Sequence, residues 1–188
     1  TNGLKLHFSY NILETKYNLE YSSTYDFDIT SVKESTKNTK PFSFPFAKII
    51  GVTQWHGNTA SQKPHTGIDF GSTKEDVLAV SDGQVVANGW DSFNGKCMSG
   101  GNYIVIKQSN GMYTAYFHLQ ESYVQYGQKV SKGTVIGISG NTGSWNCQAL
   151  KYHLHFETRL SRNQSSHVNP VDYVETDWSK ILTLNAKA

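Results

Sequence analysis

Apolar and polar residues alternate with a period of two along much of the chain, a pattern typical of half-buried β-strands. The first three segments with this pattern cover residues 4–12, 17–21 and 25–29. They predict three strands separated by polar turns, followed by a linker or exposed loop in the lysine-rich and threonine-rich residues 31–40. We therefore expect an N-terminal β-strand extension or small accessory module at residues 1–40 and a larger domain at residues 41–188. Some forty residues can barely build a separate core, which favours the extension.

Two hairpins are expected in the larger domain. Residues 103–107 and 112–116 flank an Asn-Gly dipeptide, which is strongly favoured in tight hairpin turns. Residues 77–80 and 83–87 predict a second hairpin. Sixteen glycines and four prolines among many short alternating segments favour an all-β fold, with an antiparallel β-sheet core, short strands and long loops.

A histidine and an aspartate four residues apart, His65 and Asp69, form the first candidate chemical motif. On a helix this spacing would place both side chains on one face, but Gly67 and the β-branched residues beside it disfavour a helix. We therefore expect a turn that enters a strand, with His65 at the start of the strand and Asp69 inside it.

A second motif, about ninety residues later, contains His153 and His155 in an alternating segment. Alternation directs both histidines to one face of a strand, while Leu154 and Phe156 point into a core. A single histidine on a strand is more often an ordinary surface or core residue. Two such motifs in one chain favour a metal site instead.

The combined side chains suit zinc. Two imidazoles and a carboxylate are typical zinc ligands, and three protein ligands with an open fourth position are typical of catalytic sites. Zinc lowers the pKa of bound water from about 15.7 to roughly 7, which supplies a nucleophile for hydrolysis at neutral pH. The oxyanion and the leaving group need a donor and a proton, which further histidines can supply. The residues alone leave open whether His153 or His155 binds the metal.

Five ordered segments give the chain a resemblance to the lysostaphin-like, LytM-type zinc metalloendopeptidases. These segments are residues 65–70, 111–119, 137–143, 153–157 and 168–173. The resemblance covers roughly residues 42–175. It implies that residues 41–188 form a zinc endopeptidase domain, with the sheet and its long loops around a zinc groove. Such a domain hydrolyses peptide bonds in bacterial peptidoglycan, in a stem peptide or a cross-bridge, through a metal-activated water.

The resemblance also implies roles for five residues and a place of action. His65, Asp69 and His155 match the three ligands of one zinc ion per chain. His118 and His153 match the two histidines that act around the water and the scissile carbonyl, and we assign proton transfer to them jointly. The family acts outside the cytoplasm, so the protein is expected to be secreted or in the cell envelope.

Two departures from the family pattern concern substrate recognition. Residues 144–152 replace the short turn that usually precedes the third ligand, so specificity is expected to differ in this loop. The loop before the first motif lacks the tyrosine of some members and has Trp55 and His56 instead. His56 is either an aid to the oxyanion or an ordinary loop histidine. Strict alternation places Tyr116 on the same face as His118, so we expect Tyr116 to lie beside it, with packing rather than chemistry as its role.

The two cysteines, Cys97 and Cys147, both fall in segments expected to rim the site. A disulfide between them would hold two loops together and contribute roughly 4 kcal/mol in the chain-entropy model. It would also indicate an oxidising, extracytoplasmic compartment. A pair of unrelated buried thiols is the alternative.

Composition and charge narrow the functional classes. A net charge of +2 does not imply nucleic acid or a strongly anionic membrane as a partner. Without a run of about eighteen apolar residues or a charged start before an apolar stretch, we expect neither a transmembrane helix nor a signal peptide. A catalytically silent wall-binding or regulatory module would ordinarily have lost ligand residues, and a carrier domain modified on Lys129 or Lys132 would explain none of the histidines. The expected partner is the one that the resemblance implies, the peptides of bacterial peptidoglycan.

Overall fold

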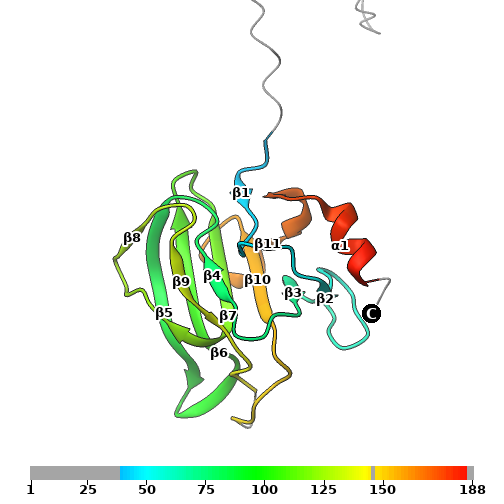
Figure 1. Cartoon of the computed structure of the whole chain (residues 1–188). Helices are drawn as coiled ribbons and strands as arrows, with labels where there is room; N and C mark the ends of the chain where they lie inside the picture. Colours follow the sequence, from blue (N-terminus) through cyan, green and yellow to red (C-terminus); the bar gives the residue numbers. More distant parts are fainter. Residues whose placement is uncertain (1–38, 145–146, 186–188) are drawn as a thin grey trace, which may run out of the picture. The chain divides into compact units, whose positions relative to one another are not determined.

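The computed structural model describes residues 39–144 and 147–185. They belong to the second of the two units into which the chain divides, Asn38–Ala188 (Figure 1). The three strands expected within residues 4–29 lie outside the described residues.

Most of the described chain forms one ten-stranded sheet. Its strands are β2 (Val52–Gln54), β3 (Ile68–Phe70), β4 (Asp76–Leu78), β5 (Gly83–Phe93), β6 (Lys96–Gln108), β7 (Tyr113–Ser122), β8 (Lys129–Val130), β9 (Val135–Ser139), β10 (Leu154–Arg159) and β11 (His167–Val168). The main path runs β2-β3-β10-β7-β6-β5-β8, while β11 pairs with β10, and β9 pairs with both β4 and β7. All of these pairs are antiparallel. The expected fold, an all-β antiparallel sheet, is therefore confirmed.

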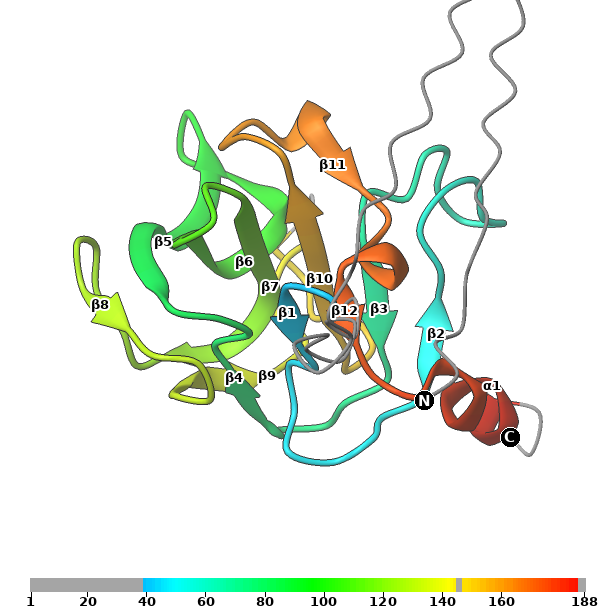
Figure 2. The same cartoon turned by 90° about the horizontal axis from the view of Figure 1, so that it is seen from above.

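The remaining elements are short. Strands β1 (Phe42–Ser43) and β12 (Val174–Glu175) form a separate parallel pair, visible in Figure 2. Two 3₁₀ turns cover Gln164–Ser166 and Pro170–Asp172, and helix α1 covers Trp178–Asn185. The sequence patterns did not indicate this helix. No helix within the described ranges has the length and apolar character needed to cross a membrane.

One expected hairpin is confirmed and the other is wrong. Strands β6 and β7 pair across the Asn-Gly turn, where Gly111 adopts a φ of 86°. Strand β4 pairs with β9, whereas β5 pairs with β6 and β8. The backbone between β4 and β5 does not form a hairpin turn. Its Ala79 amide donates to the Thr134 carbonyl, and the Ala79 carbonyl accepts from the Gly133 amide. The sequence pattern identified both strands correctly but carries no information about their partners.

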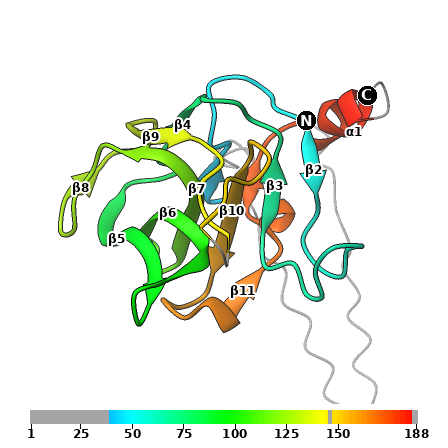
Figure 3. The same cartoon turned by 90° about the horizontal axis from the view of Figure 1, so that it is seen from below.

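The core lies between the sheet and the segments that cover it. Its largest buried aromatic side chains are Phe42, Phe70, Tyr116 and Phe156. The rings of Tyr116 and Phe156 lie 5.3 Å apart on neighbouring strands. Strand β10 therefore has a packed neighbour on each side, β7 and β3, as Figure 3 shows. This central position holds the residues of β10 in fixed register.

A disulfide joins Cys97 of β6 to Cys147 in the loop before β10, with 5.3 Å between the two Cα atoms. The bridge spans a sequence separation of 50 residues. It connects the turn between β5 and β6 to the chain that leads into the second histidine motif.

Candidate metal centre

His65, Asp69 and His155 converge on one point where β3 and β10 pair. Asp69 and His155 are direct partners in the antiparallel register, and His65 lies in the turn that enters β3. The Asp69 Oδ1 atom lies 3.1 Å from His65 Nε2 and 2.8 Å from His155 Nδ1, and the two imidazole nitrogens are 2.9 Å apart. Among the described residues, these three form the group of side chains that can hold a metal ion. The sequence motifs, far apart in the chain, therefore meet.

The hydrogen bonds on the far side of each ring decide which nitrogen faces this point. His65 Nδ1 lies 2.8 Å from the carbonyl oxygen of Trp55, which can only accept a hydrogen bond, so this nitrogen carries the proton. His155 Nε2 lies 3.0 Å from the carboxylate of Glu157 and donates to it. His65 Nε2 and His155 Nδ1 are thus directed at Asp69. Two imidazole nitrogens and a carboxylate oxygen so arranged fit a zinc ion.

The electrostatics of the centre favour positive charge. Burial alone would raise the pKa of Asp69, but hydrogen bonds from His155 and His65 outweigh burial and hold that pKa well below its usual range. Burial alone would lower the pKa of His155, but its hydrogen bonds to Asp69 and Glu157 raise it to about 9. The acceptors that favour a proton here equally favour a divalent cation.

A second pair of histidines, His118 and His153, lies beside the first group. Their ring centroids are 4.4 Å apart, and His153 Nε2 lies 3.9 Å from Asp69 Oδ2. His118 Nδ1 lies 2.8 Å from the Thr142 carbonyl oxygen, and His153 Nδ1 lies 2.7 Å from the Lys151 carbonyl oxygen. Both rings therefore carry the Nδ1 proton, and both Nε2 atoms are free to accept one. Burial, with smaller contributions from His153 and His155, lowers the pKa of His118 to about 3.

The expectation that Tyr116 lies beside His118 is wrong. Tyr116 is fully buried on the opposite face, where its hydroxyl accepts from the Val80 backbone and bonds Thr114. The cause is the backbone of His118, whose φ of 62° breaks the alternation of β7. Tyr116 is the packed core residue that its apolar surroundings require, and burial raises its pKa to about 12.

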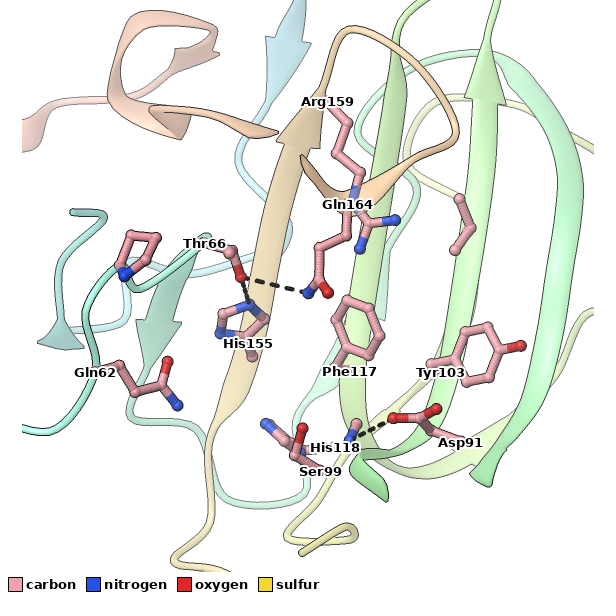
Figure 4. A pocket seen from close by; sticks show the side chains of 13 residues that line it. Gln62, Thr66, Asp91, Ser99, Tyr103, Phe117, His118, His155, Arg159 and Gln164 are labelled. Atoms are coloured by element: carbon pink, nitrogen blue, oxygen red, sulfur yellow. Dashed lines mark hydrogen bonds between the residues drawn. The ribbon is translucent and has the colours of Figure 1, made fainter. Parts of the chain in front are cut away.

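A cleft of about 380 Å³ adjoins the histidines. Figure 4 shows Thr66, Gln164, Phe117 and His155 converging along it. Phe117 lies between His155 and Tyr103, with ring centroids 5.6 and 5.9 Å away. The lining residues are Gln62, Pro64, Thr66, Asp91, Ser99, Gly100, Tyr103, Val105, Phe117, His118, His155, Arg159 and Gln164. Extended peptide is a chemically suitable occupant, because the walls combine aromatic surface with polar groups.

Sequence reasoning missed the role of Glu157. This fully buried carboxylate on β10 accepts hydrogen bonds from His155, Arg159, Thr66 and Gln164. Burial alone would raise its pKa, but the interactions with His155 and Arg159 lower it to about 2. The signal was present in the alternation of β10, since a residue two positions after His155 shares its face.

His56 pairs with another histidine. It is absent from the residues that line the cleft, and its Nε2 lies 2.8 Å from Nδ1 of His167. Burial, and secondarily His167, lowers the pKa of His56. No sequence pattern indicated this histidine pair.

Comparison with known proteins identifies the family of the chain and several relatives. The model of peptidase family M23 matches residues 63–170. The chain is 34% identical to the peptidoglycan DD-endopeptidase ShyC of Vibrio cholerae serotype O1, over 70% of this chain and 28% of that protein. It is 32% identical to the glycyl-glycine endopeptidase ALE-1 of Staphylococcus capitis, over 60% of this chain and 29% of that protein. The chain thus spans less than a third of either curated relative.

Among solved structures, the antimicrobial peptidase lysostaphin from Staphylococcus simulans is similar, with a TM-score of 0.58 and 29% identity. The match covers 71% of this chain and 52% of that one.

Proposed function

The chain belongs to peptidase family M23, and from this premise we propose that it is a zinc-dependent endopeptidase that hydrolyses peptide bonds in bacterial peptidoglycan. The observation that carries the proposal is the convergence of His65, Asp69 and His155 next to a cleft that is also lined by His118, whose ring lies beside that of His153. The similarity to a peptidoglycan DD-endopeptidase and to a glycyl-glycine endopeptidase supports the substrate class.

We assign one zinc ion per chain to His65, Asp69 and His155. When bound there, zinc would polarise the scissile carbonyl and make water a stronger nucleophile. Asp69 contributes the negative charge, and its buried setting strengthens its attraction for a cation. With zinc bound, each imidazole would present an unprotonated nitrogen whose direction is fixed by a partner on the other side of the ring.

We assign proton transfer to His118 and His153. Each has its Nδ1 proton held by a backbone carbonyl, so each Nε2 can accept a proton from the attacking water or return one to the leaving amine. The low pKa of His118 keeps its ring neutral at neutral pH, which is the form a base requires. The charged form of either ring can also donate to the developing oxyanion.

The proposed place of action is extracytoplasmic, where the substrate is found. The Cys97–Cys147 disulfide supports this placement, because such bridges persist in oxidising compartments. We assign the catalytic domain to residues 41–188 and regard residues 1–40 as its extension.

The deciding experiment combines metal content with product analysis. The zinc-loaded protein, His65→Ala and Asp69→Ala are incubated with defined muropeptides, and products are identified by mass spectrometry. We expect one zinc per wild-type chain and cleaved peptides, and loss of both in each variant. Glu121→Gln, an exposed change on β7, is the control. Full activity in either ligand variant would overturn the metal assignment, and binding of muropeptides without any product would favour a silent wall-binding module.

A further inference from the structure

Glu157 is a charged side chain in an unusual place, behind the candidate metal centre and without solvent exposure. A buried carboxylate is costly unless its oxygens receive several hydrogen bonds. Those of Glu157 receive four, from the His155 ring, the Arg159 guanidinium, the Thr66 hydroxyl and the Gln164 amide. Its position is therefore determined from several directions.

The bond from His155 has a chemical consequence. A neutral imidazole has one protonated nitrogen, and the proton resides on the nitrogen that has an acceptor. Both nitrogens of His155 have a carboxylate acceptor, since Glu157 Oε1 lies 3.0 Å from Nε2 and Asp69 Oδ1 lies 2.8 Å from Nδ1. A cation held between Asp69 and Nδ1 would take the second of these places, so the proton of the neutral ring would stay on Nε2 with Glu157. The other candidate ligand, His65, would coordinate through Nε2, because its Nδ1 donates to the Trp55 carbonyl. The two ligands thus present opposite nitrogens, and Glu157 determines the choice for His155.

Glu157 also connects the two segments that carry the ligands. Thr66, directly after His65, donates to Glu157 Oε1 from the turn before β3, while His155 donates from β10. Gly67 allows this approach, since a Cβ atom there would lie 2.3 Å from the Phe156 carbonyl oxygen and 2.9 Å from the Glu157 Cγ atom. One carboxylate thereby sets the distance between the first and third ligands.

From these contacts we propose that Glu157 is a positioning residue for metal binding: it fixes the Nε2-protonated tautomer of His155 and braces the His65 turn against β10. The inference rests on the proposed zinc function. It concerns affinity and ligand geometry, because Glu157 lies behind His155 and does not touch the reacting atoms. Partners of this kind typically change metal affinity by about 10 to 100-fold.

The test compares wild type with Glu157→Leu, Glu157→Gln and the exposed control Glu121→Gln. Zinc affinity is measured with chelator-buffered Zn²⁺, and the ligand geometry from the visible absorption of the Co²⁺ form. The His155 tautomer is read from ¹⁵N chemical shifts of the metal-free protein at a pH above the ring's pKa of about 9, where only one nitrogen carries a proton. We expect zinc binding to weaken about 100-fold in Glu157→Leu and about 10-fold in Glu157→Gln, whose single amide oxygen cannot accept from all four donors. The control should match wild type.

These measurements distinguish a failure of the proposed zinc function from a failure of the positioning role of Glu157. If wild type binds no zinc, the proposed function fails, while the tautomer of metal-free His155 still reports on Glu157. If Glu157→Leu does not fold, Glu157→Gln decides. A folded Glu157 variant with zinc affinity within twofold of wild type and an unchanged Nε2-protonated His155 would overturn the positioning role.

Discussion

His118 reaches the candidate metal centre because its backbone is left-handed, with a φ of 62° at a residue that is not glycine. Such a conformation costs roughly 1–2 kcal/mol. In an extended conformation the ring would point to the core face, where Tyr116 and Leu119 are fully buried. The hydrogen bond to the Thr142 carbonyl then fixes the ring beside His153. Strain at one residue therefore places the second histidine pair.

Replacing His118 with alanine should separate chemistry from metal binding. His118 is not among the three converging ligand side chains, so the variant should hold one zinc per chain. Loss of a proton-transfer group should reduce turnover of a muropeptide by about 10²- to 10⁴-fold. Zinc stoichiometry and initial rates, measured on the same preparation, test both statements. Loss of zinc in this variant would make His118 a ligand instead.

The pKa of His118 also predicts a pH dependence of stability in the metal-free protein. Its pKa is about 3 when folded and about 6.5 when unfolded, so between these values the unfolded chain binds the extra proton. The free energy of unfolding should therefore fall as the pH drops below about 6.5, by about 2 kcal/mol at pH 5 from this residue alone. Glu157, with a pKa near 2, adds a loss in the same direction below about pH 4.5.

Urea unfolding of metal-free wild type and His118→Gln at pH 7.5 and pH 5 measures the effect. The variant should lose less stability on acidification than wild type does. Equal losses in the two proteins would show that His118 titrates normally in the folded state.

Among the elements, strand β10 is the one whose contribution to the site was most predictable from the sequence. Alternation correctly placed Leu154 and Phe156 in the core and His155 on the opposite face. Alternation also places Glu157 on the same face as His155. Its role becomes visible only in the contact with Thr66, which is far away in sequence. Pairing partners were predictable only where a turn specified them, as between β6 and β7. The β4–β9 pair and the turned backbone of His118 depend on contacts that no local pattern records.

The close approach of the His65 turn to β10 yields a prediction for Gly67→Ala. A methyl group there overlaps the Phe156 carbonyl oxygen, a backbone atom that cannot move aside without disturbing the sheet. Overpacking of this kind costs about 1–3 kcal/mol, and the shift should weaken zinc binding as well. Denaturant unfolding and a zinc titration are the measurements.

Gly111→Ala serves as the matched control, since its Cβ would meet nothing within 4 Å although its φ is 86°. It should lose about 1 kcal/mol through backbone strain and keep wild-type zinc affinity. Unchanged zinc affinity in Gly67→Ala would mean that the spacing of β3 and β10 does not control the centre.

In the domain as a whole, the sheet positions the candidate ligands, whereas loops form part of the cleft wall. The candidate ligands lie on or next to β3 and β10, two neighbouring strands that each have a strand on both sides. The cleft wall instead includes Ser99 and Gly100, close to the disulfide that joins Cys97 to Cys147. His153 is held independently, because its backbone amide donates to the Gly140 carbonyl. The covalent bridge therefore acts on the cleft more than on the metal centre.

The double variant Cys97→Ser, Cys147→Ser tests this division. Removing a bridge with a sequence separation of 50 residues should lower the free energy of unfolding by about 4 kcal/mol in the chain-entropy model. Zinc affinity should stay within a few-fold of wild type, since the sheet positions the ligands. The Michaelis constant for a muropeptide should rise, because the cleft wall near Ser99 loses its anchor, and kcat should change less. Loss of zinc without a change in the Michaelis constant would show instead that the bridge supports the metal centre directly.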